Sequence, residues 1–91
     1  MLISIDEINK SLANKGWVYQ NKNIYKEYQF DSFLDSIDFV NQIARIAETN
    51  NHHPEININM YKVRIFISSH EIGGVTTKCV NLAMSIDLIK S

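Results

Sequence analysis

A run of apolar residues at helical spacing in the middle of the chain constrains the fold most. Asp31 and Ser32 precede a helix that we expect to cover residues 32–50. Its apolar side chains form two adjoining stripes, Phe33, Ile37, Val40, Ala44 and Ala47 beside Phe39, Ile43 and Ile46. Together they span roughly 180°, whereas a helix lying on one sheet needs only about 100°. The surplus can pack on another local element or on a second subunit, and for a chain of 91 residues we favour the subunit.

Two alternating segments after this helix predict a β-hairpin. The first alternates Ile56, Ile58 and Met60 with polar residues, and the second places apolar side chains at Val63, Ile65 and Ile67. This period of two is typical of strands with one buried face. Pro54 favours an extended backbone at His53, just before the first strand. We expect the turn at residues 60–62, although no Asn-Gly or Asp-Gly pair marks it.

The remaining segments complete an α-β-β-α-β-β-α order. Ser4 and Glu7 have capping-box spacing, which predicts a helix over 5–14 with a stop at Gly16. Segments 17–19 and 24–30 are rich in aromatic and β-branched residues and flank a polar turn, which predicts a second hairpin. Thr76 is the expected N-cap of a last helix that runs through Lys90. Two hairpins and three helices indicate an α+β fold, with an antiparallel sheet covered by helices on one face.

Composition excludes several classes of function. The length fits one domain over residues 1–91, and the single cysteine rules out a disulfide framework or a multi-cysteine zinc site. Nine basic against ten acidic residues leave a net charge of −1, which argues against nucleic-acid binding. The N-terminus reaches charge too soon for a signal peptide, and no apolar run approaches the roughly 20 residues of a membrane span. We therefore expect a cytoplasmic location, with a nuclear one also compatible.

The three histidines are the strongest candidates for chemistry. His52 and His53 lie just before one predicted strand, and His70 lies just after the next. Neighbouring antiparallel strands bring a start and an end together, so these side chains are expected at one edge of the sheet. Imidazole has an unperturbed pKa near 6.5 and can donate or accept a proton near neutrality. Glu48, one helical turn before His52, is placed to hydrogen-bond an imidazole.

Plainer readings of these residues remain open at this point. Adjacent loop histidines are more often incidental than catalytic. A three-histidine zinc site is conceivable, but the His-Glu-x-x-His spacing is absent and we expect no metal. Cys79 falls within an apolar helix, which favours packing over nucleophilic catalysis. Gly73 and Gly74 are too few for a phosphate loop and are better read as a strand-to-helix turn.

Several motifs together resemble the pterin-4a-carbinolamine dehydratases. The similarity extends from about residue 12 to residue 88 and includes Gly16-Trp17 and a Tyr28-x-Phe30-x-x-Phe33 pattern. Its most specific part is a Glu-x-x-x-His-His-Pro block followed by a third histidine. The motifs are Glu48-Thr-Asn-Asn-His52-His53-Pro54, Tyr61-Lys-Val63, Ser69-His70-Glu71, Gly73-Gly74-Val-Thr76, Asn81-Leu-Ala83 and Ile86-Asp87.

This resemblance implies a fold and a reaction. The fold would be an α+β domain with a four-stranded antiparallel sheet and helices on one face. The reaction would be dehydration of 4a-hydroxytetrahydrobiopterin to quinonoid dihydropterin plus water, a lyase step in pterin recycling. It would need no metal or other cofactor. Family members form dimers or tetramers, so we expect a homodimer or homotetramer through the helix 32–50 and a sheet edge.

The resemblance also implies residue roles. His52, His53 and His70 would be catalytic, with His52 and His70 as the acid/base pair flanking the C4a hydroxyl and His53 mainly orienting the pterin. Glu48 would support the histidines, and backbone groups of Ser68 and Ser69 would meet the amide-like edge of the pterin. The full set expected to bind substrate is Asn51, His52, His53, Ser68, Ser69, His70 and Glu71.

A second function follows from the same resemblance. Some members of the family act as dimerisation cofactors of a transcription factor, a protein-binding role that uses the helical face otherwise buried in the tetramer. In this chain we expect that face to include Phe39, Ile43 and Ile46. The sequence itself contains no sign of such a partner.

The chain departs from the family pattern at three positions. Met60 stands where an aromatic residue is usual, which suggests an altered hairpin turn, and Asn51 stands where Asp is frequent. Cys79 replaces an Asp near the start of the last helix. Counted from Thr76 as N-cap, Cys79 is at N3, so a capping-box partner is lost, at a cost of up to about 1 kcal/mol. None of these changes removes a histidine.

Overall fold

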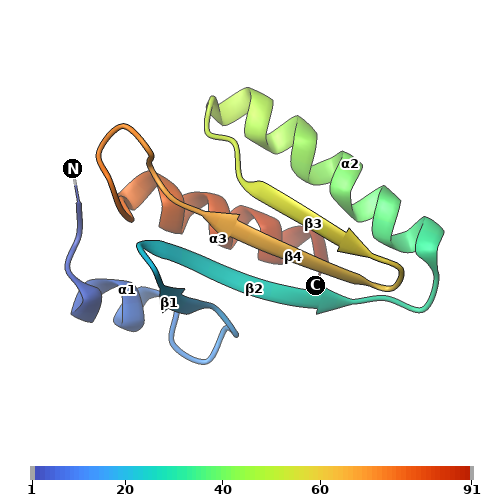
Figure 1. Ribbon diagram of the computed structural model, residues 1–91, viewed down its shortest axis with the longest axis horizontal. Helices are drawn as coiled ribbons and strands as arrows, with labels where there is room; N and C mark the ends of the chain where they lie inside the picture. Colours follow the sequence, from blue (N-terminus) through green and yellow to red (C-terminus); the bar gives the residue numbers. More distant parts are fainter. Residues whose placement is uncertain (1, 91) are drawn as a thin grey trace.

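The computed structural model describes residues 2–90 and has the predicted order of elements. Three helices and four strands alternate as α-β-β-α-β-β-α, an α+β fold (Figure 1). Their bounds are α1 Ile5–Ser11, β1 Val18–Gln20, β2 Asn23–Gln29, α2 Phe33–Asn50, β3 Glu55–Asn59, β4 Lys62–Ile67 and α3 Thr77–Lys90.

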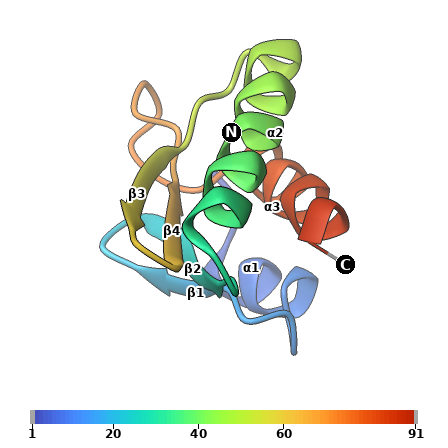
Figure 2. The same ribbon diagram turned by 90° about the vertical axis from the view of Figure 1, so that its right-hand side faces the viewer.

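The four strands form one antiparallel sheet in the order β1-β2-β4-β3. In the β3–β4 hairpin Ile58 lies opposite Val63 and Ile56 opposite Ile65, so the alternating apolar residues share one face. All three helices lie on that face and leave the other uncovered (Figure 2). The prediction of an antiparallel sheet covered on one side is therefore confirmed.

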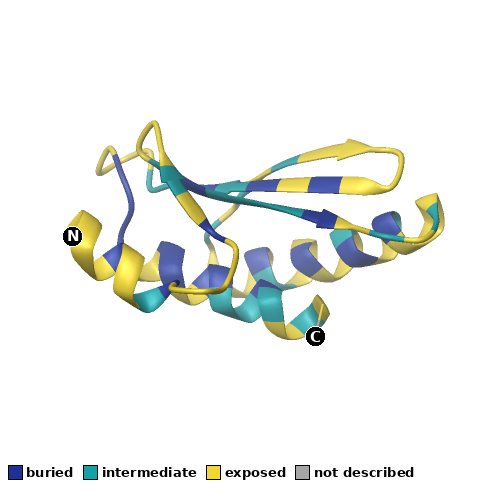
Figure 3. Ribbon diagram, turned by 90° about the horizontal axis from the view of Figure 1, so that it is seen from below, coloured by how far each residue is buried: buried dark blue, intermediate teal, exposed yellow. Residues whose placement is uncertain are grey.

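The core lies between the sheet and the helices. In Figure 3 dark buried segments alternate with exposed ones along the sheet, and the helices carry their buried segments on the side toward the sheet. From β4, Val63, Ile65 and Ile67 are fully buried, while Lys62 before them and Arg64 between the first two are exposed. The helices contribute the opposing side chains, which include Ile8, Leu12, Phe39, Ile43, Leu82, Ala83 and Ile86.

Helix α2 uses its two apolar stripes differently from the prediction. Phe39 and Ile43 are only 2% and 0% exposed, because they pack into the core. They are therefore unavailable as a docking face, and that part of the prediction is wrong. α3 packs beside α2 and covers part of its wide apolar arc (Figure 2). A helix of the same chain therefore buries some of the apolar side chains that the sheet does not cover. Phe33 and Leu34 stay exposed at the start of the helix.

Some element ends differ from the predicted ones. α1 ends at Ser11 instead of residue 14, since its C-cap Leu12 already leaves the helical region with φ −110° and ψ 14°, and Asn14 is left-handed with φ 60°. β3 ends at Asn59, because Met60 also has a positive φ, of 55°, and begins the turn. The first hairpin turns over Asn21 and Lys22, both with positive φ, as two-residue hairpin loops often require.

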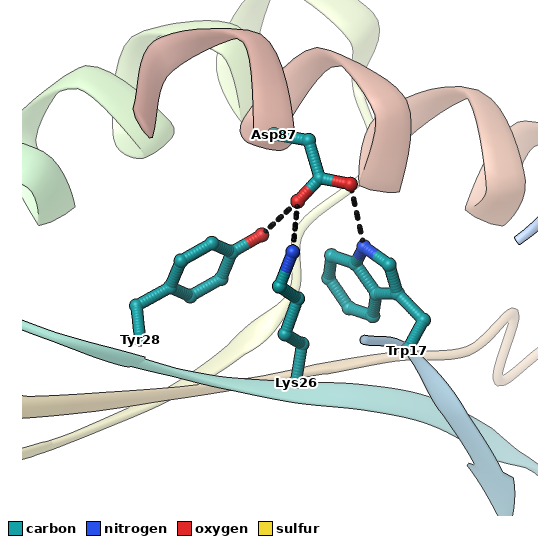
Figure 4. Close-up of polar contacts among 4 residues, drawn as sticks. All are labelled: Trp17, Lys26, Tyr28 and Asp87. Carbon is teal, nitrogen blue, oxygen red and sulfur yellow. Dashed lines mark hydrogen bonds and ion pairs between the residues drawn. The ribbon is translucent and has the colours of Figure 1, made fainter. Parts of the chain in front are cut away.

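A polar cluster around Asp87 joins α3 to the sheet (Figure 4). One carboxylate oxygen accepts hydrogen bonds from the Lys26 ammonium at 2.8 Å and the Tyr28 hydroxyl at 2.5 Å. The other accepts from the Trp17 indole at 3.0 Å. Burial, and then the neighbouring Asp87, raise the pKa of Tyr28, so its hydroxyl stays protonated as a donor. The cluster thus satisfies partly buried polar groups between the two layers.

Candidate functional site

The open end of the β3–β4 hairpin, opposite its turn, brings the three histidines to one cavity. Glu55 at the start of β3 lies opposite Phe66 near the end of β4. The segments before β3 and after β4 therefore meet at the same end of the sheet (Figure 1). They enclose a cavity of about 550 Å³ whose lining includes His52, His53 and His70. The convergence predicted from strand direction is confirmed.

The C-terminus of α2 fixes the position of His52. Asn51 caps the helix in the left-handed conformation, with φ 50°, which asparagine tolerates better than most residues. The His52 amide then donates to the Ala47 carbonyl at 3.1 Å, an extra bond that ties the residue to the last helical turn. His52 is consequently half-buried at the helix end, with its position determined by the backbone.

A closed loop over residues 69–74 holds His70. The Ser69 amide donates to the Gly74 carbonyl at 2.7 Å, and the Ser69 carbonyl accepts from the Gly73 amide at 2.7 Å. Gly73 has φ 86°, a conformation that favours glycine. This explains Gly73, whereas at Gly74 a Cβ would lie 2.7 Å from the Leu2 side chain. The two glycines form the predicted turn between β4 and α3. Because both backbone groups of Ser69 are engaged inside the loop, they are poorly placed to meet a pterin.

His52 is electrostatically distinct. Burial is the main cause that lowers its pKa, and the positive charges of Lys78, His53 and His70 lower it further. The ring is therefore neutral near pH 7, the state in which an imidazole nitrogen can accept a proton. His52 thus has the protonation state of a general base.

His53 and Glu48 form a more exposed pair. The His53 Nε2 lies 3.6 Å from the Glu48 Oε1, with side chains 55% and 80% exposed. An ion pair so open to water contributes little to stability. Glu48 therefore contacts His53, the more exposed of the two neighbouring histidines.

The cavity contains every residue predicted to bind substrate, together with others that sequence reasoning missed. Glu48 lies outside the lining. The predicted residues in the lining are Asn51, His52, His53, Ser68, Ser69, His70 and Glu71, and those added are Ile72, Thr76, Thr77 and Lys78. The added residues come from the loop after β4 and the first turn of α3. The turn predicted at Gly73 and Gly74 indicates that α3 begins at the end of the sheet where β4 ends, and this signal could have placed these residues near the histidines.

Cys79 has contacts that the predicted packing role did not include. Its side chain is fully buried, as expected for packing. However, its Sγ lies 3.3 Å from the His52 Nε2, 3.4 Å from the Ser69 Oγ and 3.5 Å from the Thr76 Oγ1. The cysteine therefore sits directly behind a histidine of the cavity.

Among residues 2–90, no three His, Cys, Asp or Glu side chains are arranged to hold a metal ion together. Over the same residues, no helix combines the length and apolar character that crossing a membrane requires.

Known proteins share both the sequence and the fold. A protein of Mycobacteroides abscessus provisionally named a pterin-4-alpha-carbinolamine dehydratase is 41% identical, covering 94% of this chain and 93% of its own. A Sulfolobus acidocaldarius protein of the same provisional name is 35% identical, over 99% and 100%. The crystal structure of a transcriptional coactivator/pterin dehydratase from Brucella melitensis superimposes with a TM-score of 0.92 at 28% identity, covering all of both chains.

A more distant structure shares the fold alone. It is a pterin dehydratase-like protein described as a RuBisCO assembly factor in the alpha-carboxysome, with a TM-score of 0.67 and 19% identity over 80% of this chain and 84% of its own.

The family model for pterin 4 alpha carbinolamine dehydratase matches residues 1–89. With this match over almost the whole sequence, the chain belongs to the pterin 4 alpha carbinolamine dehydratase family.

Proposed function

We propose that this protein is a dehydratase that converts 4a-hydroxytetrahydrobiopterin to quinonoid dihydropterin and water. The observation that carries the proposal is the meeting of three imidazoles in one cavity of about 550 Å³. A cavity of this size accommodates a small bicyclic ligand, since ligand pockets are commonly about 300–1,000 Å³. Family membership supports the same substrate class.

The reaction needs one acid and one base. The C4a hydroxyl leaves as water once an acid protonates its oxygen, as the lone pair of the adjacent nitrogen forms the new C=N bond. A base takes the proton from the ring nitrogen. We assign the base to His52, whose lowered pKa keeps it neutral, and the acid to His70 across the cavity. General acid–base catalysis of this kind contributes about 10²–10⁴-fold per group.

The other residues of the cavity bind and orient the substrate. His53 is exposed and lies beside the Glu48 carboxylate at the cavity, a polar setting that suits contact with a polar pterin edge. Because both backbone groups of Ser69 are used within its loop, we assign the amide-like edge of the pterin to the backbone of Ser68. The Asn51 and Glu71 side chains complete the polar lining of the site.

We also propose that the chain forms a homodimer or homotetramer. Phe33 and Leu34 are 52% and 71% exposed at the start of α2, and Ile37 and Val40 continue this stripe half-buried. β3 is an edge strand of the sheet, so its outer backbone groups can pair with another chain. These two features support assembly through α2 and the sheet edge.

An alternative function uses the same exposed stripe. The Brucella melitensis neighbour is described as a transcriptional coactivator as well as a pterin dehydratase. A role as dimerisation cofactor of a transcription factor would engage Phe33 and Leu34, since Phe39 and Ile43 are buried. Such a role predicts a dimer that exchanges into a mixed complex. A homotetramer that never exchanges would count against it.

A dehydration assay separates the two functions. The purified chain is mixed with freshly generated 4a-hydroxytetrahydrobiopterin, and loss of this intermediate is followed against buffer. The proposal expects faster loss with the wild type, and loss of most of that gain in His53→Ala. A wild-type rate equal to that in buffer would remove the enzymatic proposal and leave the binding role.

A further inference from the structure

The first turn of α3 carries a buried thiol that contacts a histidine of the site. The Cys79 Sγ lies 3.3 Å from the His52 Nε2, within hydrogen-bonding distance for sulfur. Cys79 is 0% exposed, whereas His52 is half-buried and lines the cavity. The thiol therefore lies behind the imidazole and contacts the candidate base without itself lining the cavity.

We propose that Cys79 is a positioning residue that orients the His52 ring and holds it in the neutral form. This inference rests on the proposed dehydratase function, in which His52 takes a proton from the substrate. Cys79 itself does not touch the substrate. It acts by presenting an uncharged partner to one ring nitrogen.

The contact fixes the ring because the sulfur is itself held. The Cys79 amide donates to the Thr76 carbonyl at 3.0 Å in the first turn of α3. The sulfur also lies within reach of the hydroxyls of Ser69 and Thr76, and these two hydroxyl oxygens are 3.0 Å apart. His52, at the end of α2, is thereby connected to the loop after β4 and to α3.

The same contact disfavours a charged ring. A protonated imidazole carries hydrogen on both nitrogens, so its Nε2 must donate to the thiol sulfur, which is a weak acceptor. The surroundings add positive charge from Lys78, His53 and His70, with Glu71 as the acidic residue in the cavity lining. A carboxylate in place of the thiol would instead favour the imidazolium, typically raising a histidine pKa by about 1–3 units. The identity of this residue therefore sets the proton affinity of the candidate base.

The contact is tested by NMR titration of the His52 ring in the full chain. In Cys79→Asp we expect the His52 pKa to rise by about one unit or more. In Cys79→Ser, which keeps a neutral hydroxyl partner, we expect a much smaller change. Val80→Ala is the matched control, because Val80 is the next buried residue of α3 and its apolar side chain offers no hydrogen bond to His52, so the His52 pKa should not move. An equal pKa in the Asp variant and the control would overturn the inference.

Kinetics tests the positioning role in the active enzyme. We expect Cys79→Ala to lower kcat by about 10- to 100-fold, as misplacement of a reacting group does, and Cys79→Ser to recover most of it. Should Cys79→Asp fail to fold, the kcat values of Cys79→Ala and Cys79→Ser test the inference without it. Wild-type kcat in Cys79→Ala would overturn the inference. An inactive wild type would instead refute the proposed function, while the titration would still report on the contact between the two residues.

Discussion

The Trp17 indole Nε1 donates a hydrogen bond to the Asp87 Oδ2 at 3.0 Å, although the two residues are 70 positions apart in the chain. With Lys26 and Tyr28 on the other oxygen, one carboxylate serves three donors from the β1–β2 region. α3 also provides Cys79 behind His52. The Asp87 cluster therefore holds the same helix that supports the candidate site.

Removal of the Asp87 carboxylate should destabilise the fold. Asp87→Ala leaves three partly buried donors without their acceptor, and we expect a loss of about 2–3 kcal/mol in the free energy of unfolding. Urea denaturation measures this loss. Asp38→Ala is the control, because Asp38 is exposed on α2, and it should change stability by less than about 0.5 kcal/mol. Equal stabilities of the two variants would refute the anchoring role.

The raised pKa of Tyr28 makes a prediction for alkaline pH. Because the folded-state pKa lies above the ordinary value of 10.0, the unfolded chain loses this proton first. The contribution to stability is complete below pH 10 and declines as the pH rises above it. At about pH 11, an absorbance titration of wild type against Tyr28→Phe should show no phenolate signal from Tyr28 in the folded protein. A phenolate signal from Tyr28 at its ordinary pKa would contradict the buried, bonded hydroxyl.

Lys78 should influence the protonation of His52. Its charge is one of the causes that lower the His52 pKa, so Lys78→Gln should raise that pKa in an NMR titration. Lys62→Gln is a matched control at the opposite end of β4 and should leave it unchanged. Because the folded-state pKa is lowered, this histidine costs no stability above about pH 6.5 and reduces stability as the pH falls below it. A His52 pKa at or above its ordinary value in the wild type would contradict this account.

The exposed stripe of α2 predicts an effect on assembly. Leu34→Glu places a charge at a side chain that is 71% exposed in the single chain, so the monomer fold should tolerate it. We expect light scattering after size exclusion to show a smaller species than for the wild type. Ile5→Glu on α1 is the control, since Ile5 is 52% exposed but lies outside the proposed interface. A monomeric wild type, or the same oligomer in both variants, would refute assembly through α2.

Much of the fold could be predicted because local patterns and burial agreed. The alternation at Ile56 and Ile58 against Val63 and Ile65 allows one register, since a shift by one residue would expose every apolar side chain. That register also brought the three histidines together. The end of α1 was less predictable, because the backbone leaves the helix at Leu12, an apolar residue that continues the helical spacing of Ile5 and Ile8.

The contacts that the sequence did not predict depend on how distant elements pack. The Cys79–His52 contact requires the first turn of α3 to lie against the end of α2, and the Asp87 cluster requires α3 to cross β2 near Trp17. Neither placement follows from periodicity. Likewise, the arc of α2 showed that two surfaces were apolar, but only the packing of α3 shows which side chains remain exposed.

The most direct test of the account is the rate of 4a-hydroxytetrahydrobiopterin dehydration by the wild type and by His52→Ala and His70→Ala. Asp38→Ala, outside the histidine cavity, is the control. We predict that the wild type and the control accelerate the reaction over buffer, and that each histidine variant lowers kcat by about 10²–10⁴-fold. A wild-type rate no faster than buffer, or histidine variants as fast as the wild type, would contradict the proposed histidine acid/base dehydratase.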